Sequence, residues 1–103
     1  MKKLKKLARR YKNTIKTVYN IMCLTDMSTR AKQLATCISL QFLVKSDAFK
    51  ANLVFSRRNL KAMASTDYDD TLLNCVKEIQ AYRIFNIDIQ SEQFIVSRVK
   101  KHD

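Results

Sequence analysis

The chain of 103 residues contains no glycine and no proline. Without glycine it cannot form the phosphate-binding loops or tight hairpin turns that need a glycine backbone. Without proline it has no stiff proline-rich linker. We therefore expect its turns to use Asn, Asp and Ser, whose short side chains bond to nearby backbone groups. Nothing in the composition divides the chain, so we expect a single domain over residues 1–103.

Residues suited to catalysis are scarce. The only histidine is His102, next to the C-terminus, so a Ser–His or Cys–His nucleophile lacks a credible base. The acidic run Asp67, Asp69 and Asp70 lacks the glycine and the distant glutamate of a calcium loop, and helix capping explains it better. We therefore expect a protein that is not an enzyme and that has no metal site and no cofactor.

The three cysteines and the short apolar runs bear on the compartment. Cys23, Cys37 and Cys75 are odd in number, widely spaced and without a C-x-x-C pair, which predicts free thiols in a reducing compartment. The longest continuous apolar run is only residues 21–24, too short for a signal-peptide core or a membrane span. These features predict a soluble cytoplasmic protein.

Acidic residues are absent before Asp26, and this makes the charge uneven. The formal net charge is +11. Eight of the twenty Lys and Arg lie within residues 2–16, whereas the rest of the chain holds twelve bases against nine acids. A positive field of this size suits nucleic acid, an anionic membrane surface or an acidic protein.

The same segment has the pattern of a basic amphipathic helix over residues 1–23. Its apolar residues recur at steps of three and four and occupy an arc of roughly 120° at 100° per residue. They are Leu4, Leu7, Ala8, Tyr11, Ile15, Val18, Tyr19 and Met22. We expect this stripe to pack on the body of the protein, with Leu4, Leu7, Tyr11, Ile15 and Val18 as core contacts and the bases facing outward.

The rest of the chain reads as alternating helices and strands. Ser28 or Asp26 can cap a helix over residues 28–38, and Tyr68–Tyr82 has a second helical stripe. Alternating apolar residues predict one hairpin with strands near 39–45 and 49–56, and another with strands near 84–89 and 94–99. A single helix competes with the first hairpin: it would be capped by Ser46 or Asp47 and would carry Phe49, Leu53, Leu60 and Met63. The stretch 57–64 is more helical than extended.

The two halves match weakly at an offset of 41 residues, and this suggests a duplication. Residues 26–64 and 67–103 would each form a helix–hairpin unit. The predicted fold is therefore α+β: an N-terminal amphipathic helix followed by two such units, which form a four-stranded antiparallel sheet with helices on one face. An all-α bundle with a C-terminal β-hairpin is the alternative.

Function is predicted from the basic residues. We expect a small non-catalytic protein that binds DNA or RNA mainly through the phosphate backbone. The candidate contacts are Lys2, Lys3, Lys5, Lys6, Arg9, Arg10, Lys12, Lys16, Arg57, Arg58, Lys61, Arg98, Lys100 and Lys101. Under the duplication, Arg57 and Arg98 would close the same edge of the sheet. The phenylalanines look like core, so base stacking is left to Tyr68 and Tyr82.

Three other partners stay open at this point. The protein-interaction alternative is a small inhibitor or adaptor that docks its basic helix on an acidic surface of a larger complex. A membrane surface is less favoured, because the helix has no Trp and two of its apolar residues are Tyr. A homodimer is the third, and an exposed apolar stripe on the first helix would favour it or the protein-interaction module.

Overall fold

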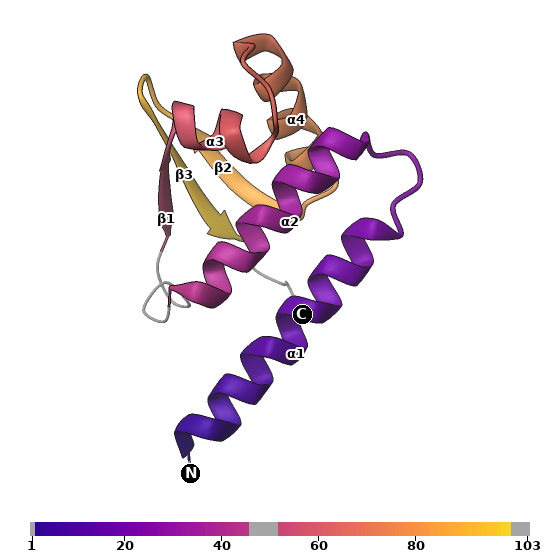
Figure 1. Ribbon diagram of the computed structural model, residues 1–103, viewed down its shortest axis with the longest axis vertical. Coiled ribbons are helices and arrows are strands. Elements are labelled where there is room, and N and C mark those ends of the chain that lie inside the picture. Colours follow the sequence, from indigo (N-terminus) through magenta and orange to yellow (C-terminus); the bar gives the residue numbers. More distant parts are fainter. Residues whose placement is uncertain (1, 46–51, 100–103) are drawn as a thin grey trace.

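The protein is an α+β globule, with four helices and a three-stranded antiparallel sheet in the part described by the computed structural model (Figure 1). That part comprises residues 2–45 and 52–99, without the side chains of residues 2–4, 6 and 7. The elements are α1 (Lys2–Met22), α2 (Thr29–Val44), β1 (Leu53–Ser56), α3 (Arg57–Met63), α4 (Asp69–Ala81), β2 (Phe85–Ile89) and β3 (Gln93–Arg98).

Helix α2 begins where the sequence predicts and ends six residues later. Ser28 caps it, because its hydroxyl accepts a hydrogen bond from the Ala31 amide at 3.2 Å and also donates one to Glu78 of α4. The predicted strand near 39–45 is wrong, since helix continues to Val44. Its apparent alternation misled because only Phe42 is buried, while Leu40 and Val44 are exposed.

The sheet has the strand order β1-β3-β2, with both neighbouring pairs antiparallel. The C-terminal hairpin of β2 and β3 is confirmed, with its turn closed by a bond from Gln90 N to Gln93 O at 2.8 Å. The first hairpin is wrong: β1 lies within the predicted second strand but pairs with β3, not with a strand at 39–45. Of the competing helix predicted here, Ser46, Asp47 and Phe49 lie outside the described residues. Leu53, which that helix would also contain, is in a strand.

These strands also overturn the duplicated architecture. Residues 43 and 44 are helical, whereas their counterparts are the bend residue 84 and residue 85, the first of β2, so the two halves do not form equivalent helix–hairpin units. The described residues contain three strands rather than four. The alternative all-α bundle is wrong as well, because β1 joins the C-terminal hairpin in one sheet.

The core lies between one face of the sheet and helices α2, α3 and α4. Phe55, Phe94 and Val96 point inward from the sheet and are at most 5% exposed, and Leu34 and Ile79 meet them from the helices. Phe42 of α2 stacks on Phe85 of β2 with ring centroids 5.5 Å apart. The phenylalanines that the structure describes are therefore core residues, as predicted, and Tyr68 and Tyr82 are exposed.

Helix α1 packs on α2, but not through the predicted stripe. Tyr11 is 49% exposed and Ile15 67%, so their prediction as core contacts is wrong, and Val18 is only half-buried. The side chains of Leu4 and Leu7 are outside the description. The helix instead buries Thr14 and Ile21, and a short connection that includes buried Met27 leads from it to α2.

Helices α3 and α4 both end with a residue in the left-handed backbone region. Ser65 has φ 54° and Arg83 has φ 56°. In each case the two amides after the helix bond back to its last turn, as Ser65 N does to Ala62 O and Thr66 N to Lys61 O. This is the Schellman arrangement, in which glycine is the favoured residue. Arg30 of α2 donates to the carbonyls of Ala64 and Ser65 and ties the end of α3 to the core.

Candidate nucleic-acid interface

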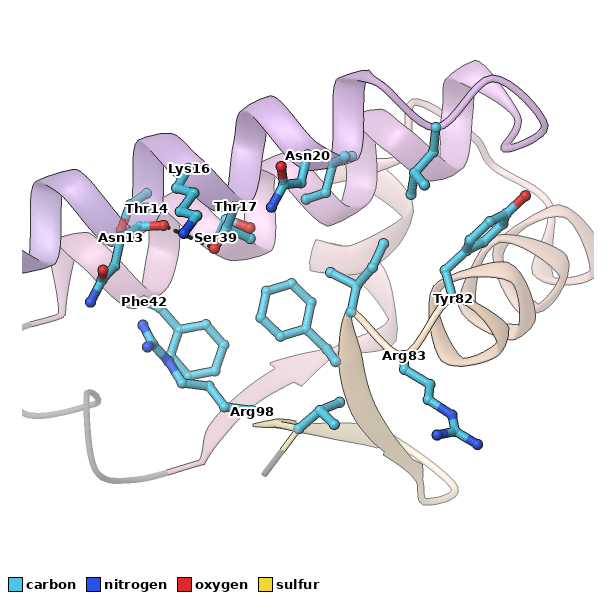
Figure 2. A pocket seen from close by; sticks show the side chains of 15 residues that line it. Asn13, Thr14, Lys16, Thr17, Asn20, Ser39, Phe42, Tyr82, Arg83 and Arg98 are labelled. Carbon is cyan, nitrogen blue, oxygen red and sulfur yellow. Dashed lines mark hydrogen bonds between the residues drawn. The ribbon is translucent and has the colours of Figure 1, made fainter. Parts of the chain in front are cut away.

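A groove of about 540 Å³ runs between α1 and the end of the sheet where β2 begins and β3 ends (Figure 2). Its volume is within the range of ligand pockets. It exists because α1 packs on α2 and leaves its polar side across from the sheet. The floor holds the stacked rings of Phe42 and Phe85, together with Ser39.

The wall formed by α1 consists of amides, hydroxyls and one cation. Asn13, Thr17 and Asn20 recur at helical spacing and face the groove, and Lys16 extends along the same wall (Figure 2). Thr17 donates its hydroxyl proton to the Asn13 carbonyl at 2.9 Å, so the donors left on this wall are the side-chain amides of Asn13 and Asn20 and the Lys16 ammonium. Such groups can bond to phosphate and sugar oxygens.

The opposite wall contributes two arginines from different elements. Arg83 follows the C-cap of α4, and Arg98 ends β3. The Arg98 guanidinium lies over the Phe42 ring, 5.1 Å from its centroid, a cation–π contact that holds the side chain at the groove. Tyr82, which is 38% exposed, adds an accessible aromatic ring at the same end.

The groove is strongly positive because none of its lining residues is acidic. Burial, and then the nearby positive charge of Arg10, lower the pKa of the Arg98 guanidinium. Arg10 belongs to α1 and is half-buried on the side that packs toward the body. An anion placed between the walls would relieve this repulsion between like charges, whereas a cation would increase it.

The predicted cations of α1 divide into three groups. Lys5, Arg9, Lys12 and Lys16 are exposed and form a band along the helix that ends at the groove. Arg10 is turned toward the body, as described above. Lys2, Lys3 and Lys6 belong to the helical backbone, but their side chains lie outside the description.

The second predicted group does not join this band. Arg57 and Lys61 both form ion pairs with Asp69 of α4, and Arg57 also lies 5.6 Å from the centroid of Phe94. Hydrogen bonding from Lys61 first, and the charges of both bases, lower the pKa of Asp69. Arg58 is exposed beside them.

The expectation that Arg57 and Arg98 close the same edge is wrong. Ser56, which precedes Arg57, pairs with Gln93 at the start of β3, whereas Arg98 is at the end of that strand. The antiparallel register therefore places the two arginines at opposite ends of the sheet. Lys100 and Lys101 lie outside the described residues.

Sequence reasoning missed Arg83 and the groove itself. Arg83 is an isolated base between Tyr82 and Ile84, so no charge run marked it. One feature of the sequence could have indicated it: Arg83 lies at the turn between a predicted helix and a predicted strand, and a residue at such a turn is close to the end of the sheet. Its place in one groove with Lys16 depends on the α1–α2 packing, which the pattern of α1 alone did not predict correctly.

Other chemistry finds no support among the described residues. They contain no cluster of three or more His, Cys, Asp or Glu that could hold a metal ion. Residues 2–45 and 52–99 also contain no helix long and apolar enough to cross a membrane. The cysteines that the structure describes are free thiols, as predicted, although only Cys75 is fully buried, and burial raises its pKa.

Known proteins offer no guide to the groove. A comparison of the chain with family models, curated proteins and solved structures finds no significant match.

Proposed function

We propose that this protein binds nucleic acid without catalysis, by holding the phosphate backbone in the groove between α1 and the sheet. The observation that carries the proposal is the composition of the groove: its lining includes Lys16, Arg83 and Arg98, from three separate parts of the chain, and no acidic side chain. The exposed band of Lys5, Arg9 and Lys12 extends this positive surface along α1.

Binding in this form is mainly electrostatic. Each cation near a phosphate releases condensed counterions, so affinity falls as salt concentration rises. The side-chain amides of Asn13 and Asn20 supply hydrogen bonds that position the backbone. Tyr82 is the one ring of the groove exposed enough to stack on a base. We therefore expect modest sequence preference.

The test is binding to duplex and single-stranded DNA and RNA over a salt series. The groove variant is Lys16→Gln/Arg83→Gln/Arg98→Gln. Its matched control is Lys45→Gln/Arg58→Gln/Lys77→Gln, which removes three exposed cations from elsewhere. The logarithm of the binding constant should fall linearly with the logarithm of the salt concentration. In the groove variant the slope of this line should be smaller, by the amount that corresponds to the loss of about two to three phosphate contacts. The control should stay close to the parent.

Two outcomes would contradict the proposal. Equal losses of nucleic-acid affinity in the groove variant and the control would mean that binding depends on net charge and not on the groove. Absence of binding at low salt, with an unchanged circular dichroism spectrum, would favour the alternative function, in which the basic helix docks on an acidic surface of a larger protein complex.

A further inference from the structure

Exposed apolar side chains are concentrated on one side of the α1–α2 pair. The structure describes ten large hydrophobic residues as exposed, and six of them belong to these two helices. We call these six the outer face: Tyr11, Ile15, Tyr19, Met22, Leu40 and Val44, which are between 46% and 74% exposed. A cluster of this kind on a small protein marks a contact surface.

The geometry of the helices places all six on the side away from the sheet. Tyr11 and Ile15 each stand two residues from a groove-lining residue of α1, a rotation of about 200°. Leu40 and Val44 likewise stand two residues after the buried Ile38 and Phe42 of α2. Since α1 packs on α2, the two apolar rows lie on one side of the helix pair.

The charged side chains within α1 and α2 are all positive. Neither α1 nor α2 contains an acidic residue. Exposed Lys5, Lys12 and Lys16 border the apolar row of α1, and exposed Lys45 follows Val44. A second copy of the chain on this face would bring two sets of unopposed cations together, which is unfavourable. The fitting occupant is both apolar and anionic.

We propose that the outer face binds an anionic lipid surface. Helix α1 would lie in the plane of the headgroups, with Ile15 and Met22 toward the acyl chains and the Tyr11 and Tyr19 rings at the headgroup level. Lysines beside the apolar row can extend their side chains along it to lipid phosphates. The groove residues Asn13, Thr17 and Asn20 are on the other side of α1, so the apolar contact is separate from nucleic-acid binding, whereas Lys5, Lys12 and Lys16 would serve both surfaces.

A lipid surface fits these observations better than an acidic protein does. The apolar row follows α1 from Tyr11 to Met22, about 16 Å at 1.5 Å per residue. A long convex row with cations beside it needs only a deformable anionic layer, whereas a protein needs a groove of matching shape. We therefore assign the face to lipid and treat a protein partner as an outcome of the test.

The first experiment is flotation with vesicles of 30% phosphatidylglycerol and 70% phosphatidylcholine, compared with phosphatidylcholine alone. The outer-face variant is Ile15→Ser/Tyr19→Ser, and its matched control is Val54→Ser/Tyr68→Ser, which alters an aliphatic and a tyrosine exposed elsewhere. Both keep every charge. We expect binding to the anionic vesicles, at least a tenfold loss in the outer-face variant and less than a twofold change in the control.

A second experiment uses the absence of tryptophan from the chain. Ile15→Trp should show a blue shift of its emission with the anionic vesicles, and Val54→Trp should not. This readout reports insertion even where a serine variant changes the fold.

Three results would overturn the proposal. Undiminished flotation of the outer-face variant would mean adsorption by charge alone. Absence of flotation of the parent protein would mean that the outer face binds a protein partner instead. A dimer of the parent in sedimentation that becomes monomeric in Ile15→Ser/Tyr19→Ser would identify a second copy of the chain as that partner. Nucleic-acid binding should survive in this variant, so failure here is distinguishable from failure of the proposed function.

Discussion

Single residues in this protein occupy positions for which glycine is the ordinary choice. Ser65 and Arg83 end α3 and α4 with φ near 55°, where a Cβ atom crowds the following carbonyl oxygen. The chain holds them there by other contacts. At Ser65 these are the Arg30 guanidinium on its carbonyl and the Gln33 amide on its hydroxyl. The left-handed backbone therefore costs stability that packing and hydrogen bonds offset.

Glycine at position 65 should give a more stable protein than alanine at the same position. Ser65→Gly removes the steric cost of the left-handed conformation but loses the bond from Gln33. Ser65→Ala loses the same hydroxyl and keeps the steric cost, so it is the matched control. We expect the glycine variant to exceed the alanine variant by about 1 kcal/mol in unfolding free energy from urea denaturation. Equal stabilities would mean that the backbone at this position is not strained.

At the scale of elements, the N-terminal helix has, besides its polar groove wall, three chemically distinct sides rather than the two that its sequence suggests. One side packs on α2 through Ile21 and Thr14, another carries exposed cations, and the third is the exposed apolar row. The strongest apolar pattern in the chain is thus not the buried one. Orientation comes from α2 and from the short connection through Met27, and neither effect is visible in the pattern of α1.

Two isoleucines on α1 test this orientation. Ile21 is 1% exposed and Ile15 is 67% exposed. Ile21→Ala should lower the unfolding free energy by about 2–5 kcal/mol, because it leaves a cavity in the core. Ile15→Ala should change it by less than about 0.5 kcal/mol. Urea denaturation of both variants measures these changes. A larger loss of unfolding free energy in Ile15→Ala than in Ile21→Ala would mean that α1 packs through the stripe that the sequence pattern predicts.

Elements with a one-sided apolar pattern were predictable from the sequence, and the exceptions have a physical reason. The stripe of α4 and the alternation of β2 and β3 each match one buried face, so type and position came out correctly. In residues 39–44 the apolar residues lie on both sides of a helix, since Leu40 is exposed and Phe42 buried. That arrangement resembles the alternation of a strand. The incorrect strand near 39–45 then made the two halves of the chain look like a duplication.

At the scale of the whole molecule, the groove could not be predicted, because its cations are far apart in the sequence. Lys16, Arg83 and Arg98 line one groove only after α1 has packed on α2 and the sheet has formed. What the composition did predict is the asymmetry of charge. Helices α1 and α2 together hold ten bases and no acid, so the molecule carries a positive layer on a body that is nearly balanced.

This positive layer should make stability depend on salt. Repulsion among the α1 cations opposes the compact state, and screening lengths fall from about 30 Å at 0.01 M salt to about 10 Å at 0.1 M. Between 10 mM and 300 mM NaCl we expect the unfolding free energy to rise by about 1 kcal/mol, which raises Tm by about 4–8 °C in a domain of this size. Thermal denaturation followed by circular dichroism measures it.

Two variants show where the repulsion originates. Lys5→Gln/Arg9→Gln/Lys12→Gln removes exposed cations that no acid in α1 opposes, so most of the gain with salt should disappear. Arg57→Gln/Lys61→Gln instead removes bases that pair with Asp69. Losing that attraction, which salt weakens, should leave the gain with salt equal or larger. An unchanged rise of unfolding free energy with salt in the α1 variant would mean that the repulsion is spread over the whole surface. The basic band of α1 would then not be the main source of the repulsion.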